Sequence, residues 1–245
     1  MDALFGGYGW RGRIGLMITS LNGVVEQEAP KMLPEGVSVH FTRLRYGAIT
    51  NEGAKLVAES VEEPAKLLTG DGRTPVDVVC FLFWGGSVSK GAGADKEMIE
   101  RIEKATGVPA VTAGTAVVQA LHKLGAKTVS AGVPIDIQIP GAKQFLEGNG
   151  FKVKDVKSLG LPTAWNVLGQ PPSVAYRLGR KLDSADVDAV VLPNSNLRTI
   201  EAIEPLEVDL GKPVVTGNQA SIWACLRKIH VNDPITGFGK LLTKY

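Results

Sequence analysis

Two short polar segments each follow an apolar run of the kind that forms a buried β-strand. The first is Trp84-Gly85-Gly86-Ser87-Val88-Ser89-Lys90-Gly91, after residues 76–83, and the second is Pro193-Asn194-Ser195-Asn196-Leu197-Arg198-Thr199, after residues 187–192. Open α/β sheets bind their ligands at the carboxyl ends of such strands. Small residues, hydroxyls and amides at these places suit hydrogen bonding to a carboxylate or a phosphate. The matched pair predicts one anion-binding site between two similar halves.

The candidate substrate-binding residues are neutral hydrogen-bonding, aromatic or very small. They are Thr19, Ser20, Asn22, Phe83, Trp84, Gly85, Gly86, Ser195 and Asn196. The candidate catalytic residues are Asp136, Ser87 and Asn194. Asp136 is either a general base or a helix cap, and Asn22 is either a donor to a carboxylate or a cap. Ser87 lacks the G-x-S-x-G context of a nucleophile, which favours an anion-binding hydroxyl.

Metal and nucleotide chemistry find no support in the residue pattern. The three histidines, His40, His122 and His230, have no metal-ligand partner at suitable spacing. Cys80 and Cys225 are the only cysteines, and both lie in apolar segments where inert buried thiols are expected. No Gly-x-Gly-x-x-Gly follows a strand, so a dinucleotide is not expected. We therefore expect no metal and no cofactor.

Length, charge and hydropathy narrow the class of protein further. The chain has 245 residues and a formal net charge of +2. This charge is too balanced to indicate binding to nucleic acid. No apolar run reaches the roughly 18 residues of a membrane helix. The first residues lack the pattern of a signal peptide, and residues 1–12 are expected to form a loose Gly-rich leader. We expect a cytoplasmic protein, and apolar helix faces are compatible with a homo-oligomer.

Hydrophobic periodicity predicts strands that alternate with helices. The predicted strands are 13–18, 37–45, 76–83, 108–111, 128–133, 151–159, 187–192 and 213–215. The predicted helices are 24–32, 51–69, 96–105, 115–124, 139–149, 174–182 and 221–228. Such alternation indicates an α/β fold with parallel sheets covered on both faces.

The pattern restarts near the middle of the chain, which indicates a duplication. The interval from the first-strand loop to the third-strand loop is similar in both parts. We predict two pseudo-symmetric βαβ domains, 1–112 plus 216–245 and 113–215. Four strand-end loops, 19–23, 84–91, 134–136 and 193–199, should converge on the cleft between them.

Two stretches resemble a known family. The first is Arg13-Ile14-Gly15-Leu16 with Asn22, Glu26 and Met32-Leu33-Pro34-Glu35-Gly36-Val37-Ser38-Val39. The second runs from Asn196-Leu197-Arg198-Thr199 through Leu210-Gly211-Lys212-Pro213-Val214-Val215-Thr216-Gly217-Asn218-Gln219-Ala220 to Gly237-Phe238-Gly239. Both are similar to the maleate cis-trans isomerase and arylmalonate decarboxylase branch of the aspartate/glutamate racemase superfamily. The resemblance implies two pseudo-symmetric α/β halves with the site between them.

The resemblance also implies a difference in chemistry. Members of the superfamily use two opposed cysteines, or in arylmalonate decarboxylases only the second. Here the first position falls at Phe83 or Trp84 and the second at Asn194, and a family Pro-Tyr corresponds to Pro134-Ile135. None of these side chains transfers protons near neutral pH.

Three functions follow from these observations. The first is an enzyme that acts on a small carboxylic acid by cysteine-independent lyase, decarboxylase-type or hydrolytic chemistry. The second is an isomerase or racemase with a repositioned group, such as Cys80. The third is a non-catalytic carboxylate-binding protein.

Overall fold

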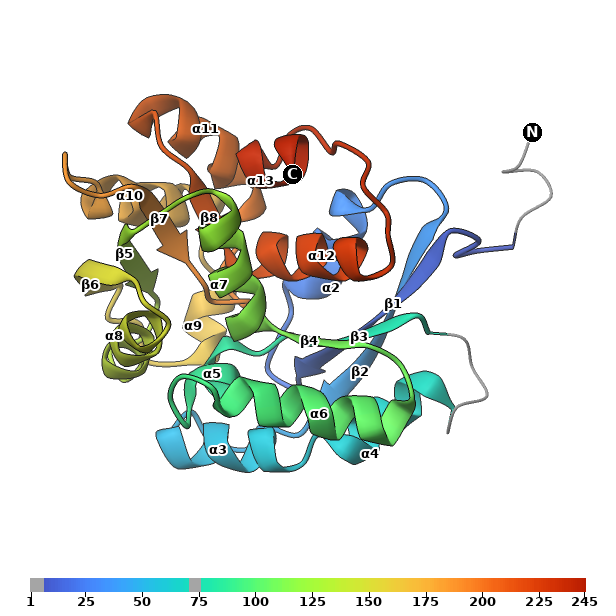
Figure 1. The fold of residues 1–245 in the computed structure, drawn as a ribbon. Helices are drawn as coiled ribbons and strands as arrows, with labels where there is room; N and C mark the ends of the chain where they lie inside the picture. Colours follow the sequence, from blue (N-terminus) through green and yellow to red (C-terminus); the bar gives the residue numbers. More distant parts are fainter. Residues whose placement is uncertain (1–6, 71–75) are drawn as a thin grey trace.

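Two four-stranded parallel sheets, one from each half of the chain, form the centre of the computed structural model, which describes residues 7–70 and 76–245 (Figure 1). The first sheet has the order β2-β1-β3-β4, with β1 (Gly12–Thr19), β2 (Val37–Leu44), β3 (Val78–Phe81) and β4 (Ala110–Thr112). The second has the order β6-β5-β7-β8, with β5 (Thr128–Val133), β6 (Lys152–Ser158), β7 (Ala189–Leu192) and β8 (Val214–Thr216). All pairings are parallel, so the α/β prediction is confirmed.

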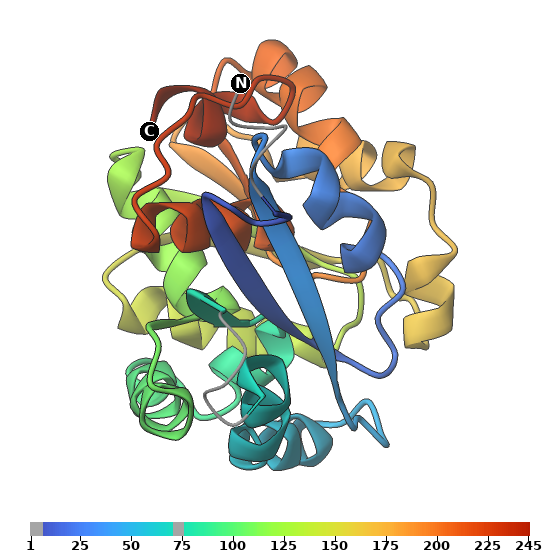
Figure 2. The same cartoon turned by 90° about the vertical axis from the view of Figure 1, so that its right-hand side faces the viewer.

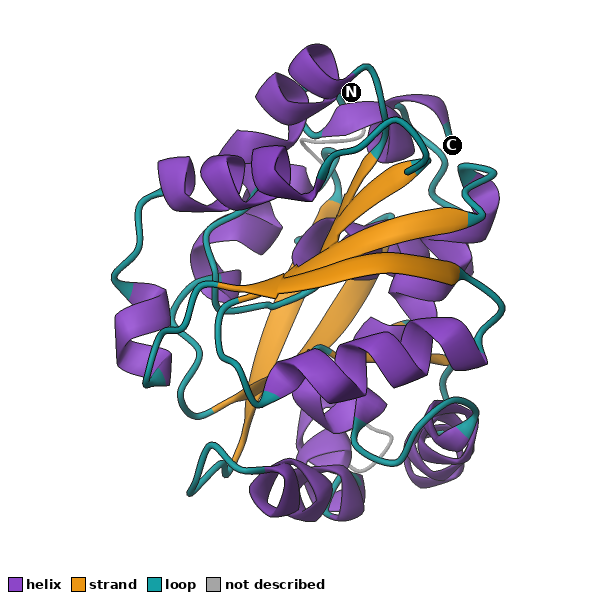
Figure 3. Cartoon of the chain, turned by 90° about the vertical axis from the view of Figure 1, so that its left-hand side faces the viewer, coloured by secondary structure: helices purple, strands orange, loops and turns teal. Residues whose placement is uncertain are grey.

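Helices cover the sheets on both faces, because the central strands are apolar on both sides (Figure 3). In the first half these are α2 (Val25–Glu28), the 3-10 turn η1 (Ala29–Met32), α3 (Asn51–Glu59), α4 (Glu62–Thr69), α5 (Trp84–Val88) and α6 (Ala94–Thr106). Then follow α7 (Ala113–Lys123), α8 (Gln138–Gly148), α9 (Ala164–Leu168), α10 (Pro172–Leu182), α11 (Ile200–Leu210), α12 (Gly217–Lys228) and α13 (Gly239–Lys244). Figure 2 shows how the long strands β1 and β2 lie among these helices.

The two halves repeat the same local contacts, which supports the duplication. The Asp77 carboxylate accepts a hydrogen bond from the Arg13 N–H at 2.7 Å, and the Asp188 carboxylate accepts one from the Thr128 N–H at 2.8 Å. In each half this contact ties the start of the third strand to the start of the first. An aspartate just before the third strand therefore holds the first strand of the sheet in both halves.

A second pair of equivalent contacts fixes the helices α7 and α12. Thr112 at the end of β4 caps α7, and Thr216 at the end of β8 caps α12, each accepting a hydrogen bond from a backbone N–H three residues ahead. The two helices pack on each other, and both contact β4 and β8. They thus join the sheets into one body and hold the strand-end loops in register.

The structure corrects several element predictions. Residues 51–69 form two helices because the backbone leaves the helical region at Ser60 (φ −119°, ψ 49°). Residues 84–88, expected as a loop, form α5, because Gly86 lets this turn pack against aromatic rings: a Cβ there would lie 2.7 Å from the Phe81 Cζ atom. Helices α9, α11 and α13 were not predicted from the sequence.

The predicted leader, residues 1–12, falls partly outside the described residues, and its last member, Gly12, begins β1. The domain boundaries at 112 and 216 stay a prediction. Among the described helices, none combines the length and the apolar character that a membrane crossing requires.

Candidate functional site

A pocket lies between the two halves where the strands of both sheets end, and all four predicted loops reach it. Its lining from the first half is Thr19, Leu21, Tyr46, Ile49, Phe83, Trp84 and Gly85. Its lining from the second half is Ile135, Gln138, Ala164, Val167, Asn194, Ser195 and Asn196. Its volume is about 40 Å³, enough for a few water molecules, so the surrounding side chains nearly fill it.

One wall of the pocket is aromatic. The Phe83 ring packs on the Tyr46 ring with centroids 4.9 Å apart, and the Trp84 ring meets Phe145 edge-on at 5.5 Å. Trp84 is only 1% exposed, so its indole is packed in the core, and the residue also lines the pocket. Ile135 and Val167 extend the apolar surface on the opposite half. A ligand here is largely shielded from water.

The polar groups of the pocket are neutral. The Asn194 side-chain oxygen accepts a hydrogen bond from the Asn196 N–H at 2.9 Å, and its NH₂ group makes no hydrogen bond within the described residues. The Trp84 indole N–H is buried and has no hydrogen-bond partner among residues 7–70 and 76–245. Burial raises the pKa of Tyr46, so its phenol stays protonated near neutral pH. The arrangement offers hydrogen-bond donors to a carboxylate and contains no cationic side chain.

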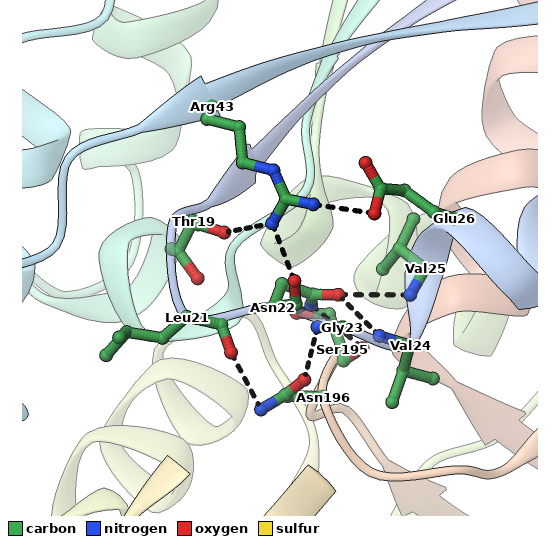
Figure 4. Close-up of polar contacts among 10 residues, drawn as sticks. All are labelled: Thr19, Leu21, Asn22, Gly23, Val24, Val25, Glu26, Arg43, Ser195 and Asn196. Carbon is green, nitrogen blue, oxygen red and sulfur yellow. Dashed lines mark hydrogen bonds and ion pairs between the residues drawn. The ribbon is translucent and has the colours of Figure 1, made fainter. Parts of the chain in front are cut away.

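Asn22 and Asn196 join the loops of the two halves (Figure 4). The Asn22 amide donates to the Ser195 backbone oxygen at 3.1 Å, and its oxygen accepts from the N–H groups of Val24 and Val25, both at 3.0 Å. The Asn196 oxygen accepts from the Gly23 N–H at 3.0 Å. These contacts fix the relative position of loops 19–23 and 193–199, and with them the shape of the pocket.

Arg43 braces the same loop from the outside (Figure 4). Its guanidinium donates to the Asn22 backbone oxygen at 2.6 Å and to the Glu26 carboxylate at 2.6 Å. Charge-assisted hydrogen bonds of this kind are stronger than neutral ones. Loop 19–23 is thus held from both sides.

A buried carboxyl, Glu28, lies behind loop 193–199. It is 2% exposed and accepts hydrogen bonds from the Thr199 N–H at 3.0 Å and from the Asn218 side-chain amide at 2.6 Å. Burial raises its pKa to about 7, against the opposing effect of these two donors. Asn218 also donates to the Ser195 backbone oxygen at 3.3 Å. Glu28 is therefore linked through one amide to the pocket loop.

The structure brings most but not all of the predicted residues together. Thr19, Phe83, Trp84, Gly85, Asn194, Ser195 and Asn196 line the pocket. Ser20, Asn22, Gly86, Ser87 and Asp136 do not. The reasons for these five differ.

Local backbone contacts account for the positions of most of these five residues. Ser87 is 1% exposed, and its hydroxyl donates to the Phe83 backbone oxygen at 3.0 Å, inside the helix. The Asn22 side-chain oxygen already accepts from the N–H groups of Val24 and Val25. The Ser20 hydroxyl accepts from the Tyr46 N–H at 3.1 Å. Gly86 packs under aromatic rings, and Asp136 is exposed to solvent beside the pocket mouth.

Sequence reasoning missed half of the lining. Leu21, Tyr46, Ile49, Ile135, Gln138, Ala164 and Val167 were not among the candidates. One signal was present: Tyr46 directly follows the predicted strand 37–45 and so lies at the same sheet edge as the chosen loops. Leu21 and Ile135 also lie in the predicted loops 19–23 and 134–136. Gln138, Ala164 and Val167 depend on how α8 and α9 pack and carried no local signal.

The two cysteines lie away from the pocket. Cys80 and Cys225 are both 0% exposed, as predicted for buried thiols, and neither lines the cavity. A hydrogen bond with the Cys80 thiol, together with burial, raises the pKa of Cys225. Within residues 7–70 and 76–245, no group of three or more His, Cys, Asp or Glu side chains is placed to hold a metal ion.

A more voluminous groove, of about 860 Å³, lies on the first half between the end of β2 and helices α3 and α4. It is lined by neither of the strand-end loops 84–91 and 193–199. We place the candidate site at the smaller pocket, because residues from both halves line it, whereas the lining of the groove comes from the first half alone.

The sequence matches known proteins along almost its whole length. A family model described as arylmalonate decarboxylase matches residues 14–242. The chain is 28% identical over 246 residues to a maleate isomerase of Pseudomonas putida, a match that covers 94% of this chain and 97% of that one. It is also 28% identical over 219 residues to an arylmalonate decarboxylase of Bordetella bronchiseptica, covering 87% and 89% of the two chains.

A solved structure shows the same fold. The structure of an arylmalonate decarboxylase variant in the liganded form aligns with a TM-score of 0.85 at 26% identity. The alignment covers 94% of this chain and 98% of that one. The two four-stranded sheets are therefore the shared architecture of both proteins.

Proposed function

Because the chain belongs to the arylmalonate decarboxylase family, we propose that it decarboxylates a small carboxylic acid without the help of a cysteine thiol. The observation that carries this proposal is the composition of the pocket. Its lining contains Asn194 and Tyr46 but neither cysteine, and both thiols are 0% exposed elsewhere in the core. A thiolate would have to leave a β-strand or a buried helix to reach a substrate.

The polar groups support a bound carboxyl group. Neutral donors, namely the Asn194 amide, the Trp84 indole N–H and the hydroxyls of the lining, can hydrogen-bond a carboxylate without neutralising it. Without a cationic partner in the lining, the anion stays reactive rather than being held in a stable ion pair. Such donors also stabilise the negative charge that develops as the reaction proceeds.

The apolar wall supports loss of CO₂. A carboxylate beside Phe83, Ile135 and Val167 is poorly solvated, which favours a reaction that converts it to a neutral product. In a malonate-type substrate one C–C bond breaks and CO₂ leaves without the bonding electron pair. That pair passes into the remaining carboxyl group, giving an enediolate.

Tyr46 is our assignment for the proton donor. It carries the one acidic proton with a titratable side chain in the described lining, and its raised pKa keeps that proton in place until a stronger base forms. The enediolate carbon takes the proton to form a new C–H bond. Water then returns a proton to the tyrosinate.

The test is NMR of 2-substituted malonates in D₂O with the purified protein, which detects both product and incorporated deuterium. We expect Tyr46→Phe to lower kcat about 100-fold or more with a small change in KM. Tyr8→Phe is the matched control, since Tyr8 is 98% exposed and far from the lining. The double variant Cys80→Ala, Cys225→Ala should retain turnover.

Three results would redirect the proposal. Turnover that disappears in the double cysteine variant while the fold is intact would support a repositioned thiol. Interconversion of maleate and fumarate under the same conditions would indicate an isomerase. Binding of acids without turnover of any of them would indicate a carboxylate-binding protein.

A further inference from the structure

A second, larger cavity adjoins the pocket, and Trp84 lines both. This outer chamber has a volume of about 210 Å³ and lies between α3, α5 and α8. It shares five lining residues with the inner pocket: Tyr46, Ile49, Trp84, Gly85 and Gln138. The two spaces therefore lie next to each other, and the shared lining residues, which include Trp84 and Gln138, form their junction.

The outer chamber contains a cation that the inner pocket lacks. Lys55, on α3, lines it and is half-buried. No ion pair of Lys55 occurs in the part of the chain that the structure describes. The acidic Glu59 on the same helix is paired with Lys90 at 3.0 Å. The charge of Lys55 is therefore available to an anion in the chamber.

Two unpaired polar atoms mark the junction independently of this charge. The Trp84 indole N–H and the Gln138 side-chain oxygen are both buried, and neither has a hydrogen-bond partner within the described residues. Leaving such groups unpaired costs free energy, so buried polar atoms usually have a partner. A polar group of a ligand that passes through the junction would supply one.

We propose that the outer chamber binds a second anionic group of the substrate, carried several bonds away from the carboxyl group held near Asn194. The substrate is then a malonate-type acid whose 2-substituent is elongated, with a polar or unsaturated middle and a further anionic group at its far end. The inner end of this assignment rests on the proposed function. The outer end rests on Lys55 and on the unpaired atoms at the junction.

The experiment is isothermal titration calorimetry with two series of probes. One is the straight-chain dicarboxylates from succinate to suberate, and the other is the monocarboxylates of the same chain lengths. We expect one or two dicarboxylates of suitable length to bind about fivefold more tightly than their monocarboxylate counterparts. Lys55→Met should remove this gain.

Lys96→Met is the matched control, because it removes the same charge from an exposed site on α6 that lines neither chamber. It should keep the full gain. Circular dichroism of both variants checks that the fold is unchanged.

The outcomes separate this proposal from the proposed function. The outer anion site is overturned if monocarboxylates bind but no dicarboxylate binds more tightly than its monocarboxylate counterpart. It is also overturned if this difference in affinity survives Lys55→Met. In both cases the proposed function stands. If dicarboxylates show the Lys55-dependent gain in affinity but no 2-substituted malonate is turned over, the outer site stands and the proposed function falls. If no acid of either series binds, the outer anion site is overturned, and turnover of 2-substituted malonates decides the proposed function separately.

Discussion

The Glu28 carboxylate accepts a hydrogen bond from the backbone N–H of Thr199 at 3.0 Å, across 171 positions of the sequence. One residue belongs to the first half, and the other ends the pocket loop of the second. Because Glu28 also accepts from Asn218, which contacts Ser195, its charge state bears on how firmly this loop is held.

Glu28 should make stability depend on pH. Burial raises its pKa to about 7 in the folded protein from an ordinary value of 4.5. The folded state therefore keeps a proton that the unfolded chain has lost. The stability contributed by protonated Glu28 is full below pH 4.5 and is lost as the pH rises through about 7.

Glu28→Gln is expected to flatten this part of the pH profile. The wild-type free energy of unfolding should fall by on the order of 3 kcal/mol more than that of the variant between these pH values. Urea unfolding at several pH values measures it. Glu207, whose pKa is also raised by burial, is present in both proteins and cancels in the comparison. Parallel profiles would mean that Glu28 ionises in the folded state as it does in water.

Asn196 and Asn194 should behave differently on replacement by alanine. The Asn196 side chain accepts from the Gly23 N–H and donates to the backbone oxygens of Leu21 and Ala164, both at 3.2 Å. Asn196→Ala should therefore cost about 2–3 kcal/mol of unfolding free energy. Asn194 makes one local contact, so Asn194→Ala should cost about 1 kcal/mol or less.

Ligand affinity gives the complementary readout for Asn194. Asn194 lines the pocket and its NH₂ group makes no hydrogen bond within the described residues, so Asn194→Ala should weaken carboxylate binding about tenfold, as followed by calorimetry. Unchanged affinity combined with a large drop in melting temperature would mean that Asn194 serves only the turn.

The sequence was sufficient for the strands and for the strand-end loops that meet at the candidate pocket. Runs such as Val187 to Leu192 are apolar at nearly every position, which happens in strands covered on both faces, and β7 lies there. Helix α11 was missed although Ile200, Ile203 and Leu206 are spaced for a helix, because Pro205 inside it is a helix-breaking signal.

The sequence was not sufficient to tell which side chains face the pocket. Asn22 and Ser87 occupy the expected loops, but backbone groups a few residues away take up their hydrogen bonds. Tyr46 reaches the pocket because its ring packs on Phe83, a contact between segments far apart in the chain. Such competition between local and distant partners is decided only by the folded structure.

The cysteines should be unreactive in the native protein. Cys80 and Cys225 are both fully buried, and the neighbouring Cys80 thiol together with burial raises the pKa of Cys225. Native protein should therefore react with a thiol reagent such as DTNB at least 100-fold more slowly than the urea-unfolded chain. A native thiol that reacts at the unfolded rate, and that a carboxylate protects, would place a cysteine in the pocket.

Two glycines of neighbouring helices should respond oppositely to alanine. In α5, a Cβ on Gly86 would lie 2.7 Å from the Phe81 Cζ atom and 2.8 Å from the Phe83 Cδ1 atom, so both rings would have to move. Gly86→Ala should lower the free energy of unfolding by about 1–3 kcal/mol. It should also alter acid binding, because Phe83 is part of the pocket wall.

Gly141→Ala, in α8, supplies the control. A Cβ there meets only the Val88 Cγ2 atom, at 3.5 Å, which is ordinary contact. Since alanine is the better helix former, this change should raise stability by up to about 1 kcal/mol. Urea unfolding of the two variants side by side tests the pair. If Gly86→Ala were as stable as Gly141→Ala, the rings of Phe81 and Phe83 would have room to retreat, and the aromatic wall could adapt to larger ligands than the pocket now admits.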